Sequence, residues 1–243
     1  MRKADRKGNM PTERPTTIYL NGEEIVTIQT SLDFLNELAV GFLASEGLLS
    51  GPDDLKKVSV DRRDGMVWVE TKSAKDIASK LVGKRFLTSG CGKGFSFYNP
   101  GDLQGLAPVE SALTVTTDRL NDLMKEVLVE SRRPGMHCSA LADGDGLIAV
   151  RHDIGRHNTV DMLVGYLVLN GIDGGRLIMM TTGRISYEMA VKAAKAKIPV
   201  IASRSAATDL AVDLAKKINV EVAGYVRGRD AVVYTRLGRI VGA

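Results

Sequence analysis

The last part of the chain alternates between apolar stretches with a helical period and short stretches rich in β-branched residues. This alternation predicts, in order, helix 157–169, strand 177–181, helix 185–197, strand 199–202, helix 207–218 and strand 220–226. Strands joined through a helix are connected by right-handed crossovers, which produce a parallel sheet covered by helices. The sequence therefore predicts an α/β fold with a mostly parallel sheet in this part of the chain.

The first part of the chain has a different pattern, in which strands and helices do not alternate. Asn21-Gly22 between β-forming stretches predicts a hairpin, and a second hairpin is predicted over 58–69. Between them, Ser31 is placed to cap a helix that ends at Gly47. We therefore expect a small α+β unit here.

An irregular stretch that contains Gly and Pro, residues 95–108, separates the two patterns. We expect three parts: a flexible basic tail at 1–14, a small α+β domain at 15–108 that carries a cysteine loop, and an α/β domain at 109–243. Other expected elements are a short helix over 74–83, a long helix that begins at Thr117, and a hairpin of 138–142 with 147–151.

The composition is that of a globular protein, with 44% hydrophobic and 26% charged residues in a chain of 243. No apolar run is long enough to span a bilayer and the N-terminus has no apolar core to act as a signal, so we expect a cytoplasmic protein without a membrane partner. The net charge of +4 comes partly from the tail. Because there is no long basic run and aromatic residues are only 5%, we do not expect nucleic acid as a partner.

The segment Thr-Ser-Gly-Cys-Gly-Lys-Gly at 88–94 is a candidate for a chemically active loop. Its glycines leave too few side chains to build a core, so we expect Cys91 in a loop that presents the thiol. The ammonium of Lys93 would favour the thiolate, which is the reactive form. The alternative is that Cys91 is a small buried residue beside a tight turn. The second cysteine, Cys138, is too isolated to indicate a disulfide framework.

The three turns that follow the predicted strands of the α/β domain each combine arginine with small hydroxyl or glycine residues. Ligands of an open parallel sheet bind beyond the carboxyl ends of its strands, where helix N-termini also point. Backbone N–H groups, helix dipoles and guanidinium groups would meet there, which indicates a site for a phosphorylated small molecule or nucleotide. The alternative is that these arginines are ordinary exposed caps. The candidate residues are Arg184, Ser186, Arg204, Ser205, Tyr225, Val226, Arg227, Gly228, Arg229 and Asp230.

The three histidines of the chain lie close together in the sequence, among other polar residues. His157, at a helix start beside Asp153, is either a general base or a hydrogen-bonded capping residue. His137 and His152 are better explained as structural histidines. The histidines and the nearby cysteine supply four candidate zinc ligands, but no pair has the short spacing of a known zinc motif. We therefore expect no metal, and we expect four supporting residues: His137, Asp153, Arg156 and His157.

The order and spacing of these motifs resemble the formate dehydrogenase accessory sulfurtransferase family, FdhD/NarQ, over nearly the whole chain. Each motif alone is weak, whereas together they are specific. The matching features are Asn21-Gly22, Gly41-Phe42-Leu43 with Glu46-Gly47, Thr-Ser-Gly-Cys-Gly at 88–92, Gly-Met-His at 135–137, Asp-Ile-Gly-Arg-His-Asn at 153–158 with Asp161, Gly-Arg-Ile-Ser-Tyr-Glu-Met at 183–189 with Lys192, Ser-Ala-Ala-Thr at 205–208 with Leu210-Ala211-Val212, and Gly-Tyr-Val-Arg-Gly-Arg at 224–229 with Tyr234-Thr235.

The resemblance implies a sulfur carrier that is required for formate dehydrogenase activity. Family members accept sulfur from a cysteine desulfurase as a persulfide and pass it to a molybdenum or tungsten cofactor, bis-molybdopterin guanine dinucleotide. By position, Cys91 would be the persulfide cysteine and Tyr225–Asp230 would lie on the cofactor-binding stretch. The resemblance also implies a three-layer, cytidine-deaminase-like α/β domain, a homodimer, and a formate dehydrogenase catalytic subunit as partner.

Two positions depart from the family pattern. Many members have a second cysteine where this chain has Gly94, so the loop cannot resolve a persulfide by an internal disulfide unless Cys138 substitutes. An acidic residue usually stands at the position of His152. The chain also lacks the zinc motifs of deaminases, so deamination is not expected. The main alternative function is a chaperone that holds the nucleotide-bearing cofactor without sulfur chemistry; a metal-dependent hydrolase and a nucleic-acid-binding protein rank lower.

Overall fold

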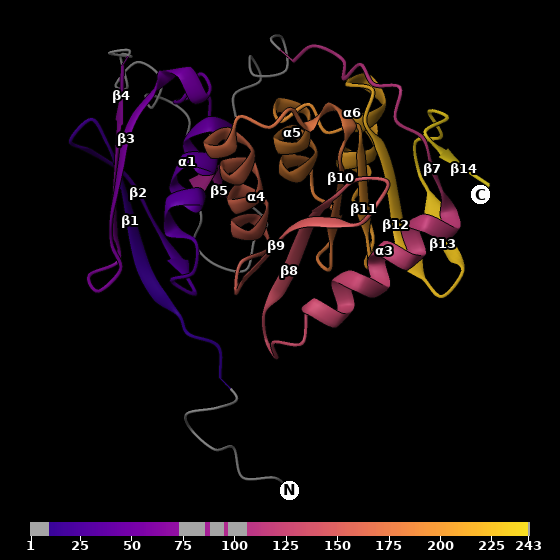
Figure 1. Ribbon diagram of the computed structural model, residues 1–243, viewed down its shortest axis with the longest axis horizontal. Coiled ribbons are helices and arrows are strands. Elements are labelled where there is room, and N and C mark those ends of the chain that lie inside the picture. The colour runs from indigo at the N-terminus through magenta and orange to yellow at the C-terminus, as the bar shows by residue number, and fades with distance from the viewer. Residues whose placement is uncertain (1–9, 73–85, 88–94, 97–105, 243) are drawn as a thin grey trace, which may run out of the picture.

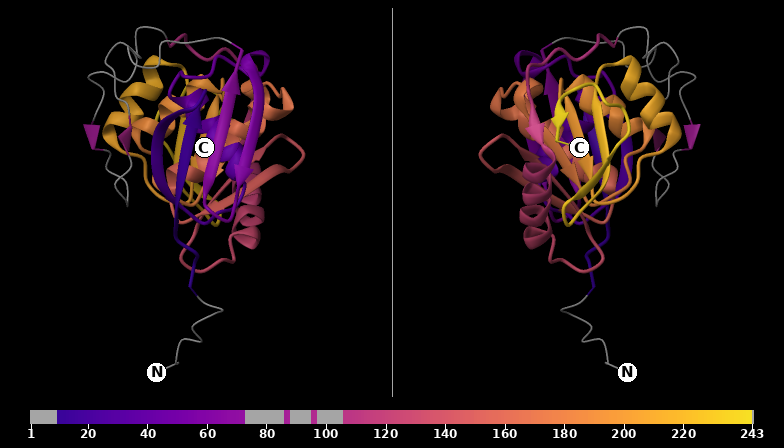
Figure 2. Two further views of the ribbon diagram at one scale, coloured as in Figure 1. Left: turned by 90° about the vertical axis from the view of Figure 1, so that its left-hand side faces the viewer. Right: turned by 90° about the vertical axis from the view of Figure 1, so that its right-hand side faces the viewer.

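The computed structural model describes residues 10–72, 86–87, 95–96 and 106–242. A four-stranded sheet stands at one end of the molecule and a six-stranded sheet lies toward the other, with helices between them (Figure 1). Figure 2 shows the four-stranded sheet facing the viewer at left and the C-terminal strands facing the viewer at right. The tail up to residue 9, the helix predicted over 74–83 and the cysteine loop lie outside the described residues.

The four-stranded sheet is built from two hairpins. Strands β1 (Arg14–Leu20) and β2 (Glu23–Thr30) are joined by Asn21 and Gly22, whose φ angles are 51° and 89°, as an Asn-Gly turn requires. Strands β3 (Leu55–Asp61) and β4 (Met66–Thr71) form the second hairpin, and β4 pairs in parallel with β1. Both predicted hairpins are confirmed, and the strand order is β2-β1-β4-β3.

Helix α1 (Leu35–Ser45) packs its apolar side chains on this sheet and is followed by the short helix η1 (Pro52–Asp54). The prediction that Ser31 caps this helix is wrong, because Phe34 occupies the N-cap position. Ser31 instead donates its backbone N–H and its hydroxyl to the carboxylate of Asp153, at 2.8 and 2.9 Å. A buried carboxylate needs hydrogen-bond donors, and this one takes both donors of Ser31.

The six-stranded sheet has the order β13-β12-β11-β10-β8-β9. Only β10, β11 and β12 are parallel to one another; β8 pairs antiparallel with β10 and with β9, and β13 pairs antiparallel with β12. The sheet is therefore mixed, and the prediction of a mostly parallel sheet is wrong. Short turns join β8 to β9 and β12 to β13, which forces antiparallel pairing. The strands are β8 (His137–Ala142), β9 (Leu147–Asp153), β10 (Ile178–Thr181), β11 (Val200–Ser203), β12 (Glu221–Arg227) and β13 (Asp230–Val233).

Helices cover both faces of the six-stranded sheet, so this part of the chain has three layers (Figure 1). Helices α4 (Arg156–Asn170), α5 (Tyr187–Lys195) and α6 (Asp209–Lys217) lie on one face, close to their predicted bounds. Helix α3 (Thr117–Glu130) covers the other face. None of the described helices has both the length and the apolar character needed to cross a membrane. The specific likeness to cytidine deaminases stays a prediction.

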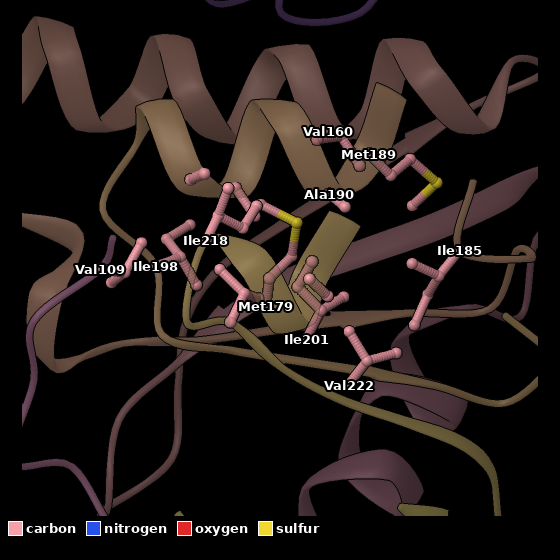
Figure 3. Close-up of a cluster of buried hydrophobic side chains, with 14 of the residues drawn as sticks. Val109, Val160, Met179, Ile185, Met189, Ala190, Ile198, Ile201, Ile218 and Val222 are labelled. Carbon is pink, nitrogen blue, oxygen red and sulfur yellow. The ribbon is translucent and has the colours of Figure 1, made fainter. Parts of the chain in front are cut away.

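The main core lies between the sheet and the layer of α4, α5 and α6. In Figure 3, Val160 and Met189 from the helices lie in one cluster with Met179 and Ile201 from the central strands. All four of these side chains are fully buried, and for the two on strands this is expected, because parallel strands are covered on both faces.

Two short strand pairings and one short helical turn complete the described part of the fold. Strand β7 (Val115–Thr116) pairs in parallel with β14 (Ile240–Val241) near the C-terminus, and β5 (Phe86–Leu87) pairs antiparallel with β6 (Phe95–Ser96). A single turn, η3 (Gly174–Arg176), precedes β10.

Helices α1 and α4 cross with their backbones in contact. A Cβ added to Gly41 would lie 1.7 Å from the backbone oxygen of Asp161, and one added to Gly165 would lie 1.9 Å from that of Glu37. Beside this crossing, the buried carboxylate of Glu37 accepts hydrogen bonds from the guanidinium of Arg151, at 2.7 Å for Nη2. The small sheet and the α/β part therefore share a close interface. The domain boundary expected at residue 108 stays a prediction.

Candidate functional site

One edge of the six-stranded sheet collects the polar residues identified in the sequence. Strands β10, β11 and β12 end there at Thr181, Ser203 and Arg227. Because β8 runs antiparallel to β10, it begins there at His137, and β9 ends there at Asp153. The N-termini of α4, α5 and α6 lie at the same edge, because each helix follows a strand that ends here. We call this region the carboxyl edge; its residues are 137–139, 153–158, 181–188, 203–209 and 225–230.

The three turns that carry arginine are hydrogen-bonded to one another. The N–H of Ile185 in the first turn donates to the carbonyl of Ala206 in the second at 2.9 Å. The N–H of Tyr225 in the third turn donates to the carbonyl of Ser205 in the second at 2.9 Å. The turns predicted to form one edge are therefore neighbours, with Arg184 exposed and Arg204 half-buried. Binding of a phosphate at these turns stays a prediction.

The third turn projects from the sheet. Tyr225 has a left-handed backbone with φ 51°, and its side chain is 44% exposed. The Nε of Arg227 donates to the carbonyl of Arg204 at 3.1 Å, and its guanidinium lies 5.4 Å from the centre of the Tyr225 ring. The side chain of Val226 is fully buried, so only its backbone is available to a ligand. The remaining candidates, Gly228, Arg229 and Asp230, are exposed.

His157, in the first turn of α4, is held by two side chains at the start of α5. Its Nε2 lies 3.1 Å from the hydroxyl of Ser186 and 3.4 Å from Oε2 of Glu188. Ser186 is the N-cap residue of α5, yet its side chain makes no capping hydrogen bond. The hydroxyl therefore positions the imidazole instead of stabilising the helix end.

The imidazole of His157 is uncharged at neutral pH. Burial lowers its pKa to about 3, and the positive charges of Lys192 and Arg156 act in the same direction. Burial also raises the pKa of Glu188. The two side chains are close enough for an ion pair, but with a neutral imidazole the contact between His157 and Glu188 is not one.

His137 and Arg156 pack against Gly183 in the first turn. A Cβ on Gly183 would lie 3.0 Å from the Cβ of Arg156 and 3.4 Å from Nδ1 of His137, so the turn approaches both side chains closely. Burial and the charge of Arg156 lower the pKa of His137. Three of the four predicted supporting residues, His137, Arg156 and His157, thus gather at the first turn.

The fourth predicted supporting residue, Asp153, has a structural role. Its buried carboxylate accepts hydrogen bonds from the N–H of Gly155 at 2.8 Å and the side-chain amide of Asn158 at 2.7 Å, in addition to the two from Ser31. Burial raises the pKa of Asp153, and these donors oppose that rise. The carboxylate ties the segment before α1 to the start of α4.

A buried ion pair one helical turn from His157 was not predicted as part of the site. The Nζ of Lys192 on α5 donates to both carboxylate oxygens of Asp161 on α4 at 2.6 Å, and the hydroxyl of Ser45 donates to the same carboxylate at 3.0 Å. Burial alone would lower the pKa of Lys192, but the carboxylate of Asp161 raises it, so the ammonium stays charged. In the sequence, Asp161 and Lys192 are among the features that match the family, and their spacing from His157 and Glu188 is i,i+4.

Cys138 and His152 lie on the face of the sheet that α3 covers, away from the other two histidines. Successive residues of a strand point to opposite faces, so Cys138 packs in the core under α3 with no exposed surface. Burial raises the pKa of its thiol to about 12. His152 bonds through Nε2 to the carbonyl of Glu130 at 2.9 Å. The four candidate zinc ligands are thus separated, and within the described part of the chain no group of three metal-ligating side chains could hold a metal.

The predicted site residues thus have different outcomes. Cys91 lies outside the described residues, as does Gly94, so the role of the loop stays a prediction. The arginine-bearing turns and three of the supporting residues meet at the carboxyl edge. Glu188 belongs to one of the motifs that match the family but was not predicted as a site residue, because on its own it looks like an ordinary acidic residue in the first turn of a helix.

The fold is that of an α/β protein in which three arginine-bearing turns meet at the carboxyl edge of a mixed, three-layer unit. The chain belongs to the FdhD/NarQ family, whose model matches residues 11–241, so the predicted family is confirmed. It is 38% identical to the sulfur carrier protein FdhD of Bacillus licheniformis, over 97% of this chain and 91% of that protein. It is 36% identical to the sulfur carrier protein FdhD of Bacillus subtilis, over 95% of this chain and 90% of that protein.

The fold is also similar to a crystal structure from Desulfotalea psychrophila. That protein is described as a formate dehydrogenase accessory protein, and the superposition has a TM-score of 0.78 at 24% identity. It covers 95% of this chain and 90% of the other. At this identity, the likeness supports the fold.

Proposed function

We propose that this protein is a cytoplasmic sulfur carrier that supplies sulfur to the cofactor of a formate dehydrogenase. In the loading step, the thiolate of Cys91 attacks the outer sulfur of a persulfide on a cysteine desulfurase. A new S–S bond forms as the old one breaks, and the desulfurase cysteine leaves as a thiolate, so no outside oxidant is consumed. In this proposal the protein is a sulfurtransferase and its carrier form is the Cys91 persulfide.

The observation that supports Cys91 is the burial of the other cysteine. The chain has two cysteines, and Cys138 has no exposed surface and a thiol pKa raised to about 12. A thiol that is neither exposed nor ionised is a poor nucleophile toward a persulfide on another protein. Cys91 is the remaining thiol, and this agrees with relatives that are named sulfur carrier proteins.

In the same proposal, the carboxyl edge holds the client cofactor, a molybdenum or tungsten bis-molybdopterin guanine dinucleotide. Arg184, Arg204 and Arg227 lie on turns that are hydrogen-bonded together, and guanidinium groups bind phosphate oxygens through paired donors. Such a held set of cations suits the phosphates of a dinucleotide. We also expect a homodimer that contacts the catalytic subunit of formate dehydrogenase.

Delivery of the carried sulfur as sulfide requires two electrons. Gly94 stands where many family members have a second cysteine, and the thiol of Cys138 is buried. Cys138 is therefore badly placed to provide the two electrons. We propose that a small thiol does so: it forms a mixed disulfide with Cys91, while sulfide replaces an oxo ligand of the metal and water is released.

Intact-mass spectrometry tests the loading step. Wild type, Cys91→Ala and Cys138→Ala are each incubated with a cysteine desulfurase and cysteine, with a known sulfur acceptor as the positive control. Wild type and Cys138→Ala should gain one sulfur, about 32 Da, which a reductant removes, and Cys91→Ala should gain nothing.

An adduct that persists in Cys91→Ala would place the carried sulfur elsewhere and refute the role of that cysteine. No adduct on wild type, while the control acceptor is loaded, would favour the cofactor-holding chaperone. The chaperone predicts GDP binding that is unaffected by Cys91→Ala but lost in Arg227→Ala and Arg229→Ala.

A further inference from the structure

The first turns of α5 and α6 occupy equivalent places, but their N-cap residues are used differently. Both helices follow a parallel strand of the same sheet. Thr208, the N-cap residue of α6, accepts a hydrogen bond from the N–H of Ala211 at 3.3 Å. Ser186, the N-cap residue of α5, bonds to His157 instead. A capping bond typically contributes about 1 kcal/mol, so α5 loses stability at the position where it fixes one imidazole.

The fixed imidazole has one nitrogen left for a ligand. Ser186 and Glu188 both contact Nε2 of His157, while Nδ1 makes no hydrogen bond to any residue in the described part of the chain. Among the described residues, the buried side-chain atoms that lack a hydrogen-bond partner do not include Nδ1 of His157. Because Nδ1 has no partner, it must therefore have some exposed surface. If the ring is protonated, Nε2–H faces Ser186 and the Glu188 carboxylate, and Nδ1–H is free to donate to an anion.

The charges around His157 oppose its protonation until an anion is bound. The pKa of His157 is lowered to about 3, and burial is the largest cause. Lys192 on α5, Arg156 on α4 and His137 on β8 lower it further. Glu188, on α5, is the acidic side chain within reach of the ring. At an effective dielectric constant of about 20, one negative charge about 6 Å away raises the pKa of a histidine by about 2. A bound dianion near the ring would therefore oppose these charges and raise the pKa of His157.

We infer that the carboxyl edge takes up a phosphate-type dianion together with one proton, which is held on Nδ1 of His157. Ser186 and Glu188 are positioning residues, because they fix the ring so that Nδ1 stays available. The inference rests on the proposed function, in which the phosphates of the guanine dinucleotide lie at this edge. By linkage, the anion strengthens proton binding as much as the proton strengthens anion binding.

NMR follows this proton directly, because the chain has only three histidines. The imidazole signals of the full-length protein are recorded from about pH 4.5 to about pH 8.5, with and without saturating GDP as the phosphate probe. Single variants assign the three signals. With GDP, the titration midpoint of His157 should move from below this range into it. The midpoint of His152, which bonds to Glu130 on the other face of the sheet, should not move.

The dissociation constant for GDP in wild type and His157→Asn provides the second measurement. Once the pH is below the midpoint of the GDP-bound protein, the affinity of wild type relative to the variant should rise by up to about tenfold for each pH unit that the pH falls. Titration of the GDP phosphates affects both proteins equally, so it cancels in this ratio.

The outcomes separate the two proposals. GDP binding with no movement of the His157 midpoint would overturn the proton-coupled uptake alone. If wild type does not bind GDP, the phosphate edge and this inference are both overturned, while the persulfide step on Cys91 stands or falls by the mass measurement. The NMR measurement uses wild type, so it decides the question even if His157→Asn fails to fold.

Discussion

Replacing Gly165 by alanine tests the contact between the backbones of α1 and α4. A Cβ at this position would lie 1.9 Å from the carbonyl oxygen of Glu37 and 2.8 Å from its Cα. Cβ atoms essentially never approach other heavy atoms within 3.0 Å, so the helices would have to separate by about 1.1 Å. Both close atoms belong to the backbone, so no side-chain rotation can relieve the overlap.

The expected size of the effect follows from two opposing terms. Alanine favours a helix interior over glycine by about 1 kcal/mol. Against this, overpacking typically costs about 1–3 kcal/mol, and a separation of this size weakens the dispersion contacts across the interface. The same movement would stretch the bond from Arg151 to Glu37 and the bond from Ser45 to Asp161, each buried and each contributing about 1–3 kcal/mol. We expect a net loss of about 3 kcal/mol of stability.

Thermal unfolding followed by circular dichroism measures this loss. For a chain of this length, about 3 kcal/mol lowers Tm by about 6–12 °C. Gly144→Ala is the matched control, because a Cβ there meets nothing within 4 Å, and its Tm should stay within about 2 °C of wild type. A Gly165→Ala protein with the Tm of wild type, or a higher one, would refute the reasoning, because helix propensity would then outweigh the backbone contact.

Two further predictions concern the buried charges. Lys192→Met should destabilise the protein by about 3–5 kcal/mol, because it leaves the carboxylate of Asp161 buried without its ammonium, and Lys192→Met/Asp161→Asn should recover most of the loss in urea unfolding. A single variant as stable as wild type would show that the pair is not ionised. His157 gains a proton near pH 6.5 in the unfolded chain but only near pH 3 in the folded protein. Stability should therefore also fall as the pH drops between these two values, by up to about 1.4 kcal/mol per pH unit. The raised pKa values of Asp153 and Glu188 act in the opposite direction. The slope of stability against pH is therefore compared between wild type and His157→Asn. Equal slopes would contradict a neutral, buried His157.

The helices and central strands were predictable because their signals are local. The apolar period sets the bounds of α4, α5 and α6, and Asn21-Gly22 sets the first hairpin turn. The mixed sheet was not predictable, because the sequence of a hairpin does not say which strand it will pair with. Strand β13 was missed for a related reason: Gly228-Arg229 was interpreted as part of a ligand-binding turn, whereas it also joins β12 to β13.

The position of the carboxyl edge was predictable because parallel strands must end on the same side of a sheet. The contacts within it were not. Ser31 has the local signature of a helix cap, but it bonds to a carboxylate 122 residues away. Glu188 and Lys192 have the spacing of an exposed i,i+4 pair, and only the packing of α5 on α4 shows that Lys192 is buried against Asp161.

A line of polar contacts links helix α1, which packs on the small sheet, to the carboxyl edge. The backbone contact of α1 with α4 brings the hydroxyl of Ser45 to Asp161, whose carboxylate holds the ammonium of Lys192. That ammonium, fixed in a buried position, helps to keep His157 neutral. Helix α1 thus contributes to the charge state of His157, although no described hydrogen bond joins the two. Loosening the α1–α4 contact should therefore hold the ammonium of Lys192 less firmly and weaken its effect on the pKa of His157. We expect the Gly165→Ala protein to show a raised titration midpoint of His157 by NMR, in addition to its lower stability.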